Sequence, residues 1–248
     1  VNEKKPHIIG ITETWCNSTV LESEVAIDGY QLYRLDKDSI SGKGGGVILY
    51  IHNSLSAVEC HEIQNHKFNS SVWCEIKLEK NEKLLVGLCY RSPNDSTEEN
   101  NQKLLDQMMH TAKVRNVTHL LVMGDFNFPE INWKIGSVKE AMDSPQQKFY
   151  DALQDLFLVQ HVEKPTRRRG DQKPSLLDLV ISRDEHMVNG IEHQAAYGNS
   201  DHDVLIWEYE TTTEVHEIDN DTMAFNYPTG DYVKVKADPR IRTCIIRT

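Results

Sequence analysis

The stretch LLVMGDFN, residues 120–127, passes from an apolar run directly into a glycine, an aspartate and an asparagine. The apolar run predicts a buried strand, and glycine with Asx residues favours a tight turn after it. A turn without further function is therefore one interpretation of GDFN. The other is that Asp125 and Asn127 end a buried strand as part of a functional site.

Further apolar or alternating runs predict strands on both sides of this stretch. They cover residues 7–14, 30–35, 47–51, 72–78, 84–90, 158–162, 176–182 and 204–209. The spacing of those between 30 and 90 suggests consecutive, largely antiparallel strands. Two helices are expected: one over 96–112, with Ser96 and Glu99 as a capping box, and one capped by Ser144 with Pro145 at its first position.

Strands outnumber helices in this pattern, and helices interrupt the strands at intervals. That predicts a four-layered α/β sandwich, in which two packed β-sheets are flanked by helices. The pattern covers residues 1–210 as one domain. From about residue 211 the apolar periodicity fades, so 211–248 are interpreted as a linker or tail.

Composition narrows the class of protein. The chain has 248 residues, 39% of them hydrophobic, and no apolar run approaches the roughly 20 residues that span a bilayer, so no membrane partner is expected. Its five cysteines are widely spaced without a CxxC, which argues against a disulfide framework and a zinc site. A net charge of −11 counts against a protein that coats DNA, but it leaves open both a nuclease and an enzyme for small phosphate esters.

Polar residues recur where predicted strands begin or end. They are Glu13, Asp125, Asn127, Asp178, Asp201 and His202. A carboxylate in an apolar strand is costly unless it is paired or metal-bound, and oxygen ligands favour Mg²⁺ or Mn²⁺ over Zn²⁺. Each residue also has a plainer interpretation: Glu13 as a surface residue, Asp178 as the structural partner of an arginine, and Ser-Asp-His as a loop or cap.

Taken in order, these motifs resemble the endonuclease/exonuclease/phosphatase superfamily. The ordered set, over about residues 7–209, is TETW (12–15), GGGVILYI (44–51), YRSP (90–93), GDFN (124–127), LLDLVIS (176–182) and SDH (200–202). IDGYQLYRLD (27–36), KGGGV (43–47) and EKPTRRRG (163–170) are similar to endonuclease domains of non-LTR retrotransposons. FNYPTGDY (225–232) resembles the linker that leads toward the reverse transcriptase in such elements.

The resemblance implies a Mg²⁺- or Mn²⁺-dependent endonuclease that nicks one DNA strand and leaves a 3′-hydroxyl. It implies that Glu13 binds the metal with Asp201 beside it, and that Asp125 positions or deprotonates the attacking water. Tyr90, Asn127 and His202 contact the phosphate, and Asp178 orients the His202 imidazole. General chemistry supports this last pair, because a carboxylate fixes the tautomer of an imidazole and stabilises its charged form.

The family also opens with a strand that carries an asparagine at the metal site, some tens of residues before the glutamate. Asn2 lies too close to Glu13 to serve, so we expect an N-terminally truncated domain whose first strand a parent protein supplies. Two alternatives stay open: an enzyme of the same fold acting on another phosphoester, and an inactive truncated fragment.

The expected partners are DNA and a reverse transcriptase domain of the same parent polyprotein, and the expected location is nuclear or cytoplasmic. The basic run Arg167, Arg168 and Arg169 is interpreted either as contacts to the DNA backbone or as a solvated loop.

Overall fold

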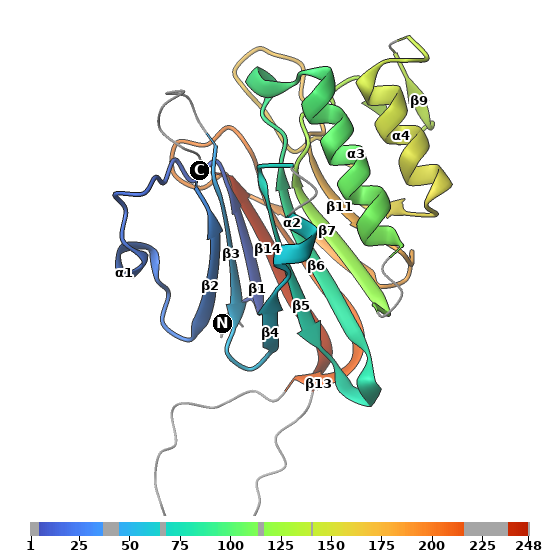
Figure 1. Ribbon diagram of the computed structural model, residues 1–248. Helices are drawn as coiled ribbons and strands as arrows, with labels where there is room; N and C mark the ends of the chain where they lie inside the picture. Colours follow the sequence, from blue (N-terminus) through green and yellow to red (C-terminus); the bar gives the residue numbers. More distant parts are fainter. Residues whose placement is uncertain are drawn as a thin grey trace, which may run out of the picture.

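Two six-stranded sheets packed face to face form the centre of the protein (Figure 1). The structure, a computed structural model, describes residues 5–36, 45–64, 68–113, 117–139, 141–215 and 238–247. Lys43, Gly44 and the stretch 225–232, which entered the sequence comparison above, lie outside these ranges. Within them, no helix combines the length and the apolarity that crossing a bilayer requires.

The first sheet has the strand order β12-β13-β14-β1-β3-β2. Its strands are β1 (Ile8–Thr12), β2 (Tyr30–Leu35), β3 (Val47–His52), β12 (Val188–Gln194), β13 (Val204–Val215) and β14 (Asp238–Arg247). Burial alternates along β1, as expected of a strand with only one face in the core. β14 runs parallel to β1 and antiparallel to β13, while β1, β3 and β2 are antiparallel neighbours.

The second sheet has the strand order β10-β11-β7-β6-β5-β4. Its strands are β4 (Ser56–Glu59), β5 (Ser71–Lys77), β6 (Lys83–Tyr90), β7 (His119–Asp125), β10 (Val159–Gln160) and β11 (Asp178–Ser182). A small separate ribbon pairs β8 (Ile131–Asn132) with β9 (Ser137–Val138). Nearly every residue of β6, β7 and β11 is buried, which requires that both faces of this sheet be covered.

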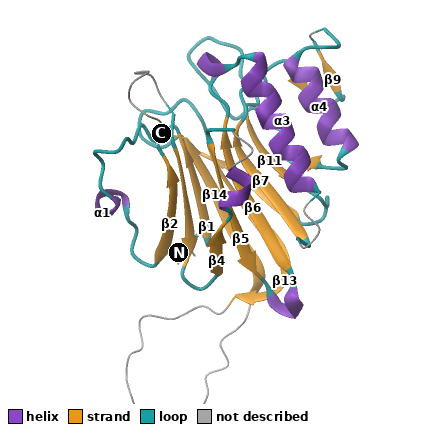
Figure 2. Ribbon diagram, viewed as in Figure 1, coloured by secondary structure: helices purple, strands orange, loops and turns teal. Residues whose placement is uncertain are grey.

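Helices provide the outer cover of the second sheet. α3 (Glu98–Ala112) and α4 (Pro145–Asp155) lie along it, as Figures 1 and 2 show. Among the described residues, the other α-helices are α1 (Glu22–Val25) and α2 (His61–Gln64), and short 3-10 turns occur at Glu79–Asn81 and Pro93–Asp95. The sandwich of two sheets with flanking helices is confirmed, and the long helices lie on one side of it.

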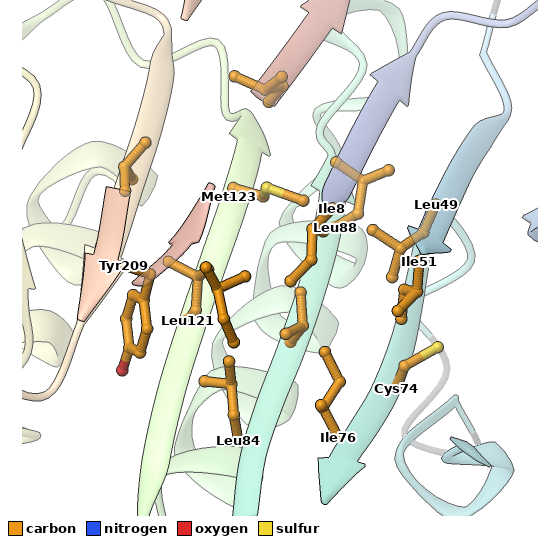
Figure 3. Packing of buried hydrophobic residues seen from close by; sticks show 14 of the residues in the cluster. Ile8, Leu49, Ile51, Cys74, Ile76, Leu84, Leu88, Leu121, Met123 and Tyr209 are labelled. Carbon is orange, nitrogen blue, oxygen red and sulfur yellow. The ribbon is translucent and has the colours of Figure 1, made fainter. Parts of the chain in front are cut away.

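Two apolar cores correspond to these layers. Between the sheets, Ile8, Leu49, Leu88 and Met123 belong to one continuous cluster of buried side chains (Figure 3). Between the second sheet and its helices, a second cluster includes Phe149 and other aromatic and aliphatic side chains. Burial of such side chains is the main favourable term in folding, about 25 cal/mol per Å² of apolar surface.

Most of the predicted elements form close to their expected bounds. α4 is capped as predicted, because the Ser144 hydroxyl accepts from the Gln147 N–H at 3.2 Å. α3 instead begins one residue later than the predicted cap: Thr97, and not Ser96, accepts from the N–H of Asn100 at 3.2 Å. The strands between 30 and 90 form antiparallel pairs, but β2–β3 and β5–β6 belong to different sheets.

The end of the chain differs from the expected linker or tail over 211–248. β13 continues to Val215, and residues 238–247 form β14, which lies inside the first sheet between β13 and β1. Ile241, Thr243 and Ile245 alternate along β14 and are buried. The first sheet is therefore continuous from β13 through β14 and β1 to β3. The sequence analysis missed β14 because the apolar alternation that marks it, along 241–245, is short.

Replacement of Ile245 by alanine tests the place of β14. We expect Ile245→Ala to lower the free energy of unfolding by about 2–5 kcal/mol, the usual cost of a cavity at a buried isoleucine. Urea denaturation followed by tryptophan fluorescence measures the change. Ile135→Ala is the matched control, because Ile135 is 70% exposed. Equal stability of Ile245→Ala and wild type would mean that β14 does not pack in this core.

Candidate active site

Strand direction brings three predicted residues together in the second sheet. β6 and β7 are parallel and end side by side, with Tyr90 opposite Asp125. β11 runs antiparallel to β7 and therefore begins at the same edge, with Asp178 opposite Asp125. The carboxylates that the sequence places 53 residues apart are thus cross-strand neighbours.

The first sheet contributes its residues from the same edge. β1 and β14 are parallel, so Thr12 lies opposite Arg247, and Glu13 follows directly after Thr12. β13 runs antiparallel to β14, and Asp201 and His202 precede its first residue. The two sheets contact each other here through β7, which packs against both β1 and β14.

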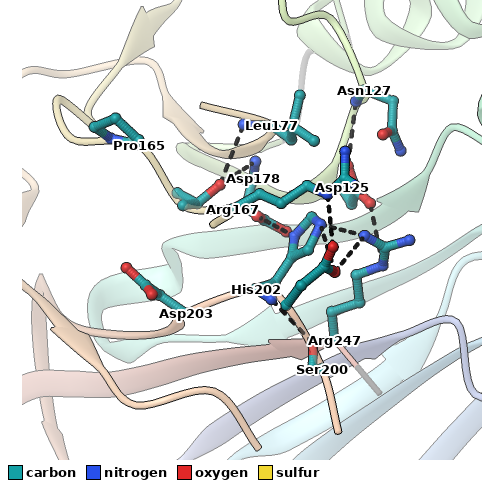
Figure 4. Close-up of polar contacts among 12 residues, drawn as sticks. Asp125, Asn127, Pro165, Arg167, Leu177, Asp178, Ser200, His202, Asp203 and Arg247 are labelled. Carbon is teal, nitrogen blue, oxygen red and sulfur yellow. Dashed lines mark hydrogen bonds and ion pairs between the residues drawn. The ribbon is translucent and has the colours of Figure 1, made fainter. Parts of the chain in front are cut away.

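The Asp178 carboxylate and the His202 imidazole form a buried pair (Figure 4). His202 Nδ1 lies 2.7 Å from Asp178 Oδ2, which joins the first sheet to the second. The other ring nitrogen, Nε2, is in close contact with the guanidinium of Arg247. Because a guanidinium only donates, Nε2 must accept and Nδ1 must carry the proton toward Asp178. The predicted pairing therefore forms, with Nε2 directed into the site.

The loop before β11 holds this pair in position. The buried Thr166 hydroxyl accepts from the backbone N–H groups of Leu177 and Asp178, both at 3.1 Å. Arg167 forms isolated β-bridges with Ser175 and with His202. The segment EKPTRRRG thus connects the strand that carries Asp178 to the loop that carries His202.

Four predicted residues surround the guanidinium of Arg247. Its Nη2 donates to Glu13 Oε1 at 2.7 Å, its Nε lies 3.6 Å from Asp125 Oδ2, and its Nη1 lies 3.8 Å from Asp201 Oδ1. His202 is the fourth neighbour. Burial alone would lower the pKa of Arg247, but the carboxylates of Asp125 and Glu13 outweigh burial and raise that pKa.

Asp125 is fully buried at the centre of this group. Its Oδ1 accepts from the N–H of Asn127 at 3.2 Å, whereas Oδ2 has no hydrogen-bond partner among the described residues. Burial, and then the nearby carboxylate of Asp178, raise the pKa of Asp125 to about 7, against a smaller lowering by His202 and Arg247. A carboxyl group with this pKa exchanges protons near neutral pH.

Glu13 is placed by the loop that follows β1. Its φ is +54°, in the left-handed region that non-glycine residues rarely adopt. The backbone N–H of Thr14 donates to the carbonyl of Gly46 at 3.3 Å, and a side chain at Gly46 would collide with Thr14 Oγ1. The Tyr90 hydroxyl then donates to the Glu13 carboxylate. Burial, followed by this hydrogen bond, raises the pKa of Tyr90. Gly45 and Gly46 of the glycine run and Tyr90 of YRSP are therefore in contact with TETW.

Arg91 holds the turn GDFN, a role that the sequence did not reveal. Its guanidinium donates to the carbonyl of Asn127 at 2.9 Å and to Asn101 Oδ1 at 2.7 Å, and it lies 4.0 Å from the centre of the Phe128 ring. In return, the Asn127 side-chain amide donates to the carbonyl of Arg91 at 2.9 Å. Burial lowers the pKa of Arg91 to about 10.

Gly124 permits the close approach of β6 and β7 before this turn. A side chain there would lie 1.8 Å from the carbonyl oxygen of Cys89, and its φ is +147°. Packing therefore requires the glycine of GDFN. The close packing at Gly124 fixes the backbone from which the Asp125 and Asn127 side chains extend.

The three arginines of the basic run have different surroundings. Arg167 Nε donates to Asp201 Oδ2 at 2.9 Å, and Arg168 pairs with Asp203. Burial would raise the pKa of Asp201, but the hydrogen bond and charge of Arg167 outweigh it and lower that pKa. Arg169 is exposed. The run therefore lies beside the site, with Arg167 bonded to one of its acids.

The structure thus gathers every predicted catalytic and metal-site residue at one edge. Asp125, Asp178 and His202 each offer a ligand atom within 4.8 Å of the others, while Glu13 and Asp201 reach the group through Arg247. The sequence reading missed Thr166, Arg91 and Arg247. Arg91 belongs to the motif YRSP, which could have drawn attention to it. For Arg247, the signal in the sequence was the apolar alternation along 241–245, which marks the strand that carries it.

Comparison with known proteins agrees with this fold. Residues 84–206 match a family described as "Endonuclease-reverse transcriptase". The endonuclease domain of TRAS1, a telomere-specific non-LTR retrotransposon, superposes with a TM-score of 0.59 at 14% identity, over 84% of this chain and 100% of that one. No curated protein sequence matches the chain.

Two further solved structures have the same fold. AP endonuclease LMAP from Leishmania major superposes with a TM-score of 0.60 at 12% identity, over 80% of this chain and 76% of that one. The APE2 catalytic domain of Xenopus laevis superposes with a TM-score of 0.54 at 13% identity, over 79% and 81%.

The two paired sheets with their flanking helices have the endonuclease/exonuclease/phosphatase fold. The chain has that fold, its residues 84–206 match the endonuclease-reverse transcriptase family, and it is similar in structure to the endonuclease domain of a non-LTR retrotransposon.

Replacement of Arg91 tests the account of the GDFN turn. We expect Arg91→Met to lower the free energy of unfolding by about 2–4 kcal/mol, because buried carbonyls and Asn101 lose a charged donor. Thermal and urea denaturation measure it. Arg169→Met removes the same charge from an exposed position and is the control. A loss no larger than in the control would contradict the role given to Arg91.

Proposed function

We propose that the chain is a divalent-metal-dependent endonuclease that nicks one strand of DNA and leaves a 3′-hydroxyl. The observation that carries the proposal is the buried Asp178–His202 pair beside the buried Asp125 carboxylate, with Glu13 facing them. Phosphodiester hydrolysis needs a base for water, donors for the phosphate oxygens and anionic ligands for a cation. These groups supply all three.

The donor set fits Mg²⁺ or Mn²⁺. Glu13, Asp125 and Asp201 offer carboxylate oxygens, the ligands that hard divalent cations prefer. Asp125 Oδ2 is a buried acceptor without a hydrogen bond, which is the kind of atom that a bound cation satisfies. Glu13, with Asp201 beside it, would hold the metal, which when bound would neutralise negative charge developing on the phosphate.

Asp125 is the proposed base. Its pKa of about 7 lies near the operating pH, where a general base is most effective. In the proposed reaction its carboxylate takes a proton from water, the water oxygen bonds to phosphorus, and the bond from phosphorus to the 3′-oxygen breaks. The 3′-oxygen takes up a proton and leaves as the hydroxyl.

His202, Tyr90 and Asn127 are the proposed phosphate contacts. The Asp178 carboxylate at Nδ1 fixes the His202 ring with Nε2 directed into the site. When Arg247 moves away and Nε2 takes up a proton, Nε2 would donate to a phosphate oxygen. The hydroxyl of Tyr90 and the amide of Asn127 now donate to Glu13 and to the Arg91 carbonyl. Both would exchange these partners for the phosphate when DNA binds.

The likeness to a retrotransposon endonuclease supports DNA as the substrate, and the family description supports a reverse transcriptase domain in the same parent polyprotein. We extend the proposal to both partners, and to action in the nucleus or cytoplasm.

Plasmid nicking tests the function. We expect the chain to convert supercoiled DNA to the open-circle form with Mg²⁺ or Mn²⁺ and to stop when EDTA is added. His202→Ala should slow cleavage more than about 100-fold, the usual loss of an electrostatic donor. His186→Ala, at an exposed histidine, is the control.

Full nicking in EDTA, or normal nicking by His202→Ala, would refute the assignment. Release of phosphate from an inositol phosphate without nicking would favour the alternative of another phosphoester substrate.

DNA affinity at several salt concentrations tests the basic run. The Arg168 side chain pairs with Asp203, and Arg168 contacts Asp201 only through a backbone hydrogen bond that alanine keeps. Joint replacement of Arg168 and Arg169 by alanine therefore separates contact with the DNA backbone from chemistry. We expect equal weakening at every DNA sequence and a log–log salt slope smaller by about 0.9 for each lost phosphate contact.

Lys77→Ala with Lys80→Ala is the matched control. β5 ends at Lys77, antiparallel to β6, so both lysines lie at the opposite edge from the site. An unchanged slope in the arginine variant would leave the run as a solvated loop. Arg167 is tested separately, because its removal also releases Asp201.

A further inference from the structure

The acidic site contains a cation that belongs to the chain itself. The Arg247 guanidinium lies among Glu13, Asp125 and Asp201, at 2.7, 3.6 and 3.8 Å from their oxygens, and against Nε2 of His202. The negative charge of these acids is therefore opposed by a guanidinium from β14, the last described strand (Figure 4).

The guanidinium takes the oxygen atoms that a divalent metal needs. Glu13 and Asp201 are the proposed metal residues, and Arg247 bonds to the first and faces the second. An arginine side chain stays protonated in proteins, so it presents a permanent positive charge with five donors. Two cations a few Å apart repel each other strongly even at an effective dielectric constant of about 20. A metal at these oxygens and Arg247 in its present position therefore exclude each other.

The backbone of β14 holds the Arg247 main chain in a fixed position. β14 is hydrogen-bonded to β13 on one side and to β1 on the other, and Ile241 and Ile245 are buried between the sheets. If a divalent metal binds at these oxygens, the Arg247 side chain must therefore move, because the backbone does not. That side chain is 15% exposed, so it already borders solvent.

We propose that Arg247 is the internal cation of the active site and lowers its affinity for divalent metal. The inference rests on the proposed function, because it takes Glu13 and Asp201 as metal residues. Metal binding moves the guanidinium away from Glu13, and the size of this cost sets the metal concentration that the enzyme requires.

Titration of the full chain with Mn²⁺, followed by electron paramagnetic resonance of the free ion, tests the proposal without a cleavage assay. We expect Arg247→Met to bind Mn²⁺ at least about tenfold more tightly than wild type, because a competing charge is lost. Arg242→Met is the matched control: it lies on the same strand, removes the same charge and pairs with Glu208 instead. Its affinity should change less than about twofold, as screening predicts for a remote charge.

Two further variants make the result decisive. Arg247→Gln keeps a donor for Glu13 and should show the same gain, so it replaces Arg247→Met if that variant fails to fold by circular dichroism. Adding Glu13→Gln to Arg247→Met should abolish the gain.

Equal or weaker Mn²⁺ binding by both Arg247 variants, with measurable binding by wild type, would overturn the inference and leave the proposed function standing. If no variant and no wild type binds Mn²⁺, both the inference and the metal dependence are refuted.

Discussion

At the edge where the acids gather, polar contacts join the two sheets in place of the apolar packing that joins them elsewhere. They pair Asp178 with His202, Glu13 with Tyr90, and Asp125 with Arg247. Each contact links one sheet to the other, so the same residues form the candidate active site and join the two sheets. The geometry of the site therefore depends on the sheets being packed in one register.

Residues that take no part in the proposed reaction hold the site residues in position. Gly124 lets β6 and β7 approach closely before the GDFN turn, and Arg91 holds that turn through its carbonyl groups. Thr166 bonds to the backbone at the start of β11, and Gly46 supports the loop after β1. Side chains on rigid strands are held more accurately than side chains on loops, and here the loops are tied to the strands.

The buried carboxylates also create a charge problem that the fold resolves locally. Burial and the proximity of Asp178 make the ionised form of Asp125 unfavourable, which raises its pKa toward neutrality. His202 and Arg247 oppose that effect from the facing sheet. The same buried negative charge favours a guanidinium within the site, because unpaired buried acids are costly.

The sequence determined the local elements and the residue types of the site. Apolar runs predicted β2, β6 and β7, and the Ser144 cap predicted the start of α4, because these signals depend on neighbours a few residues away. It also marked the polar residues at strand ends as chemically unusual. Their roles as base, ligand and phosphate contacts remain predictions that the geometry permits.

Only the tertiary structure decided which distant residues meet. Asp178 and Asp125 are opposite each other because β7 and β11 are antiparallel, and Arg247 reaches Glu13 because β14 enters the first sheet beside β1. Both outcomes depend on strand pairing, which periodicity does not encode: an alternating segment such as 241–245 states which side chains are buried, but not which strands will flank it. The sequence by itself therefore determined which acidic, basic and amide side chains this protein can use. The pairing of the strands decided that the Arg247 guanidinium lies among the acids.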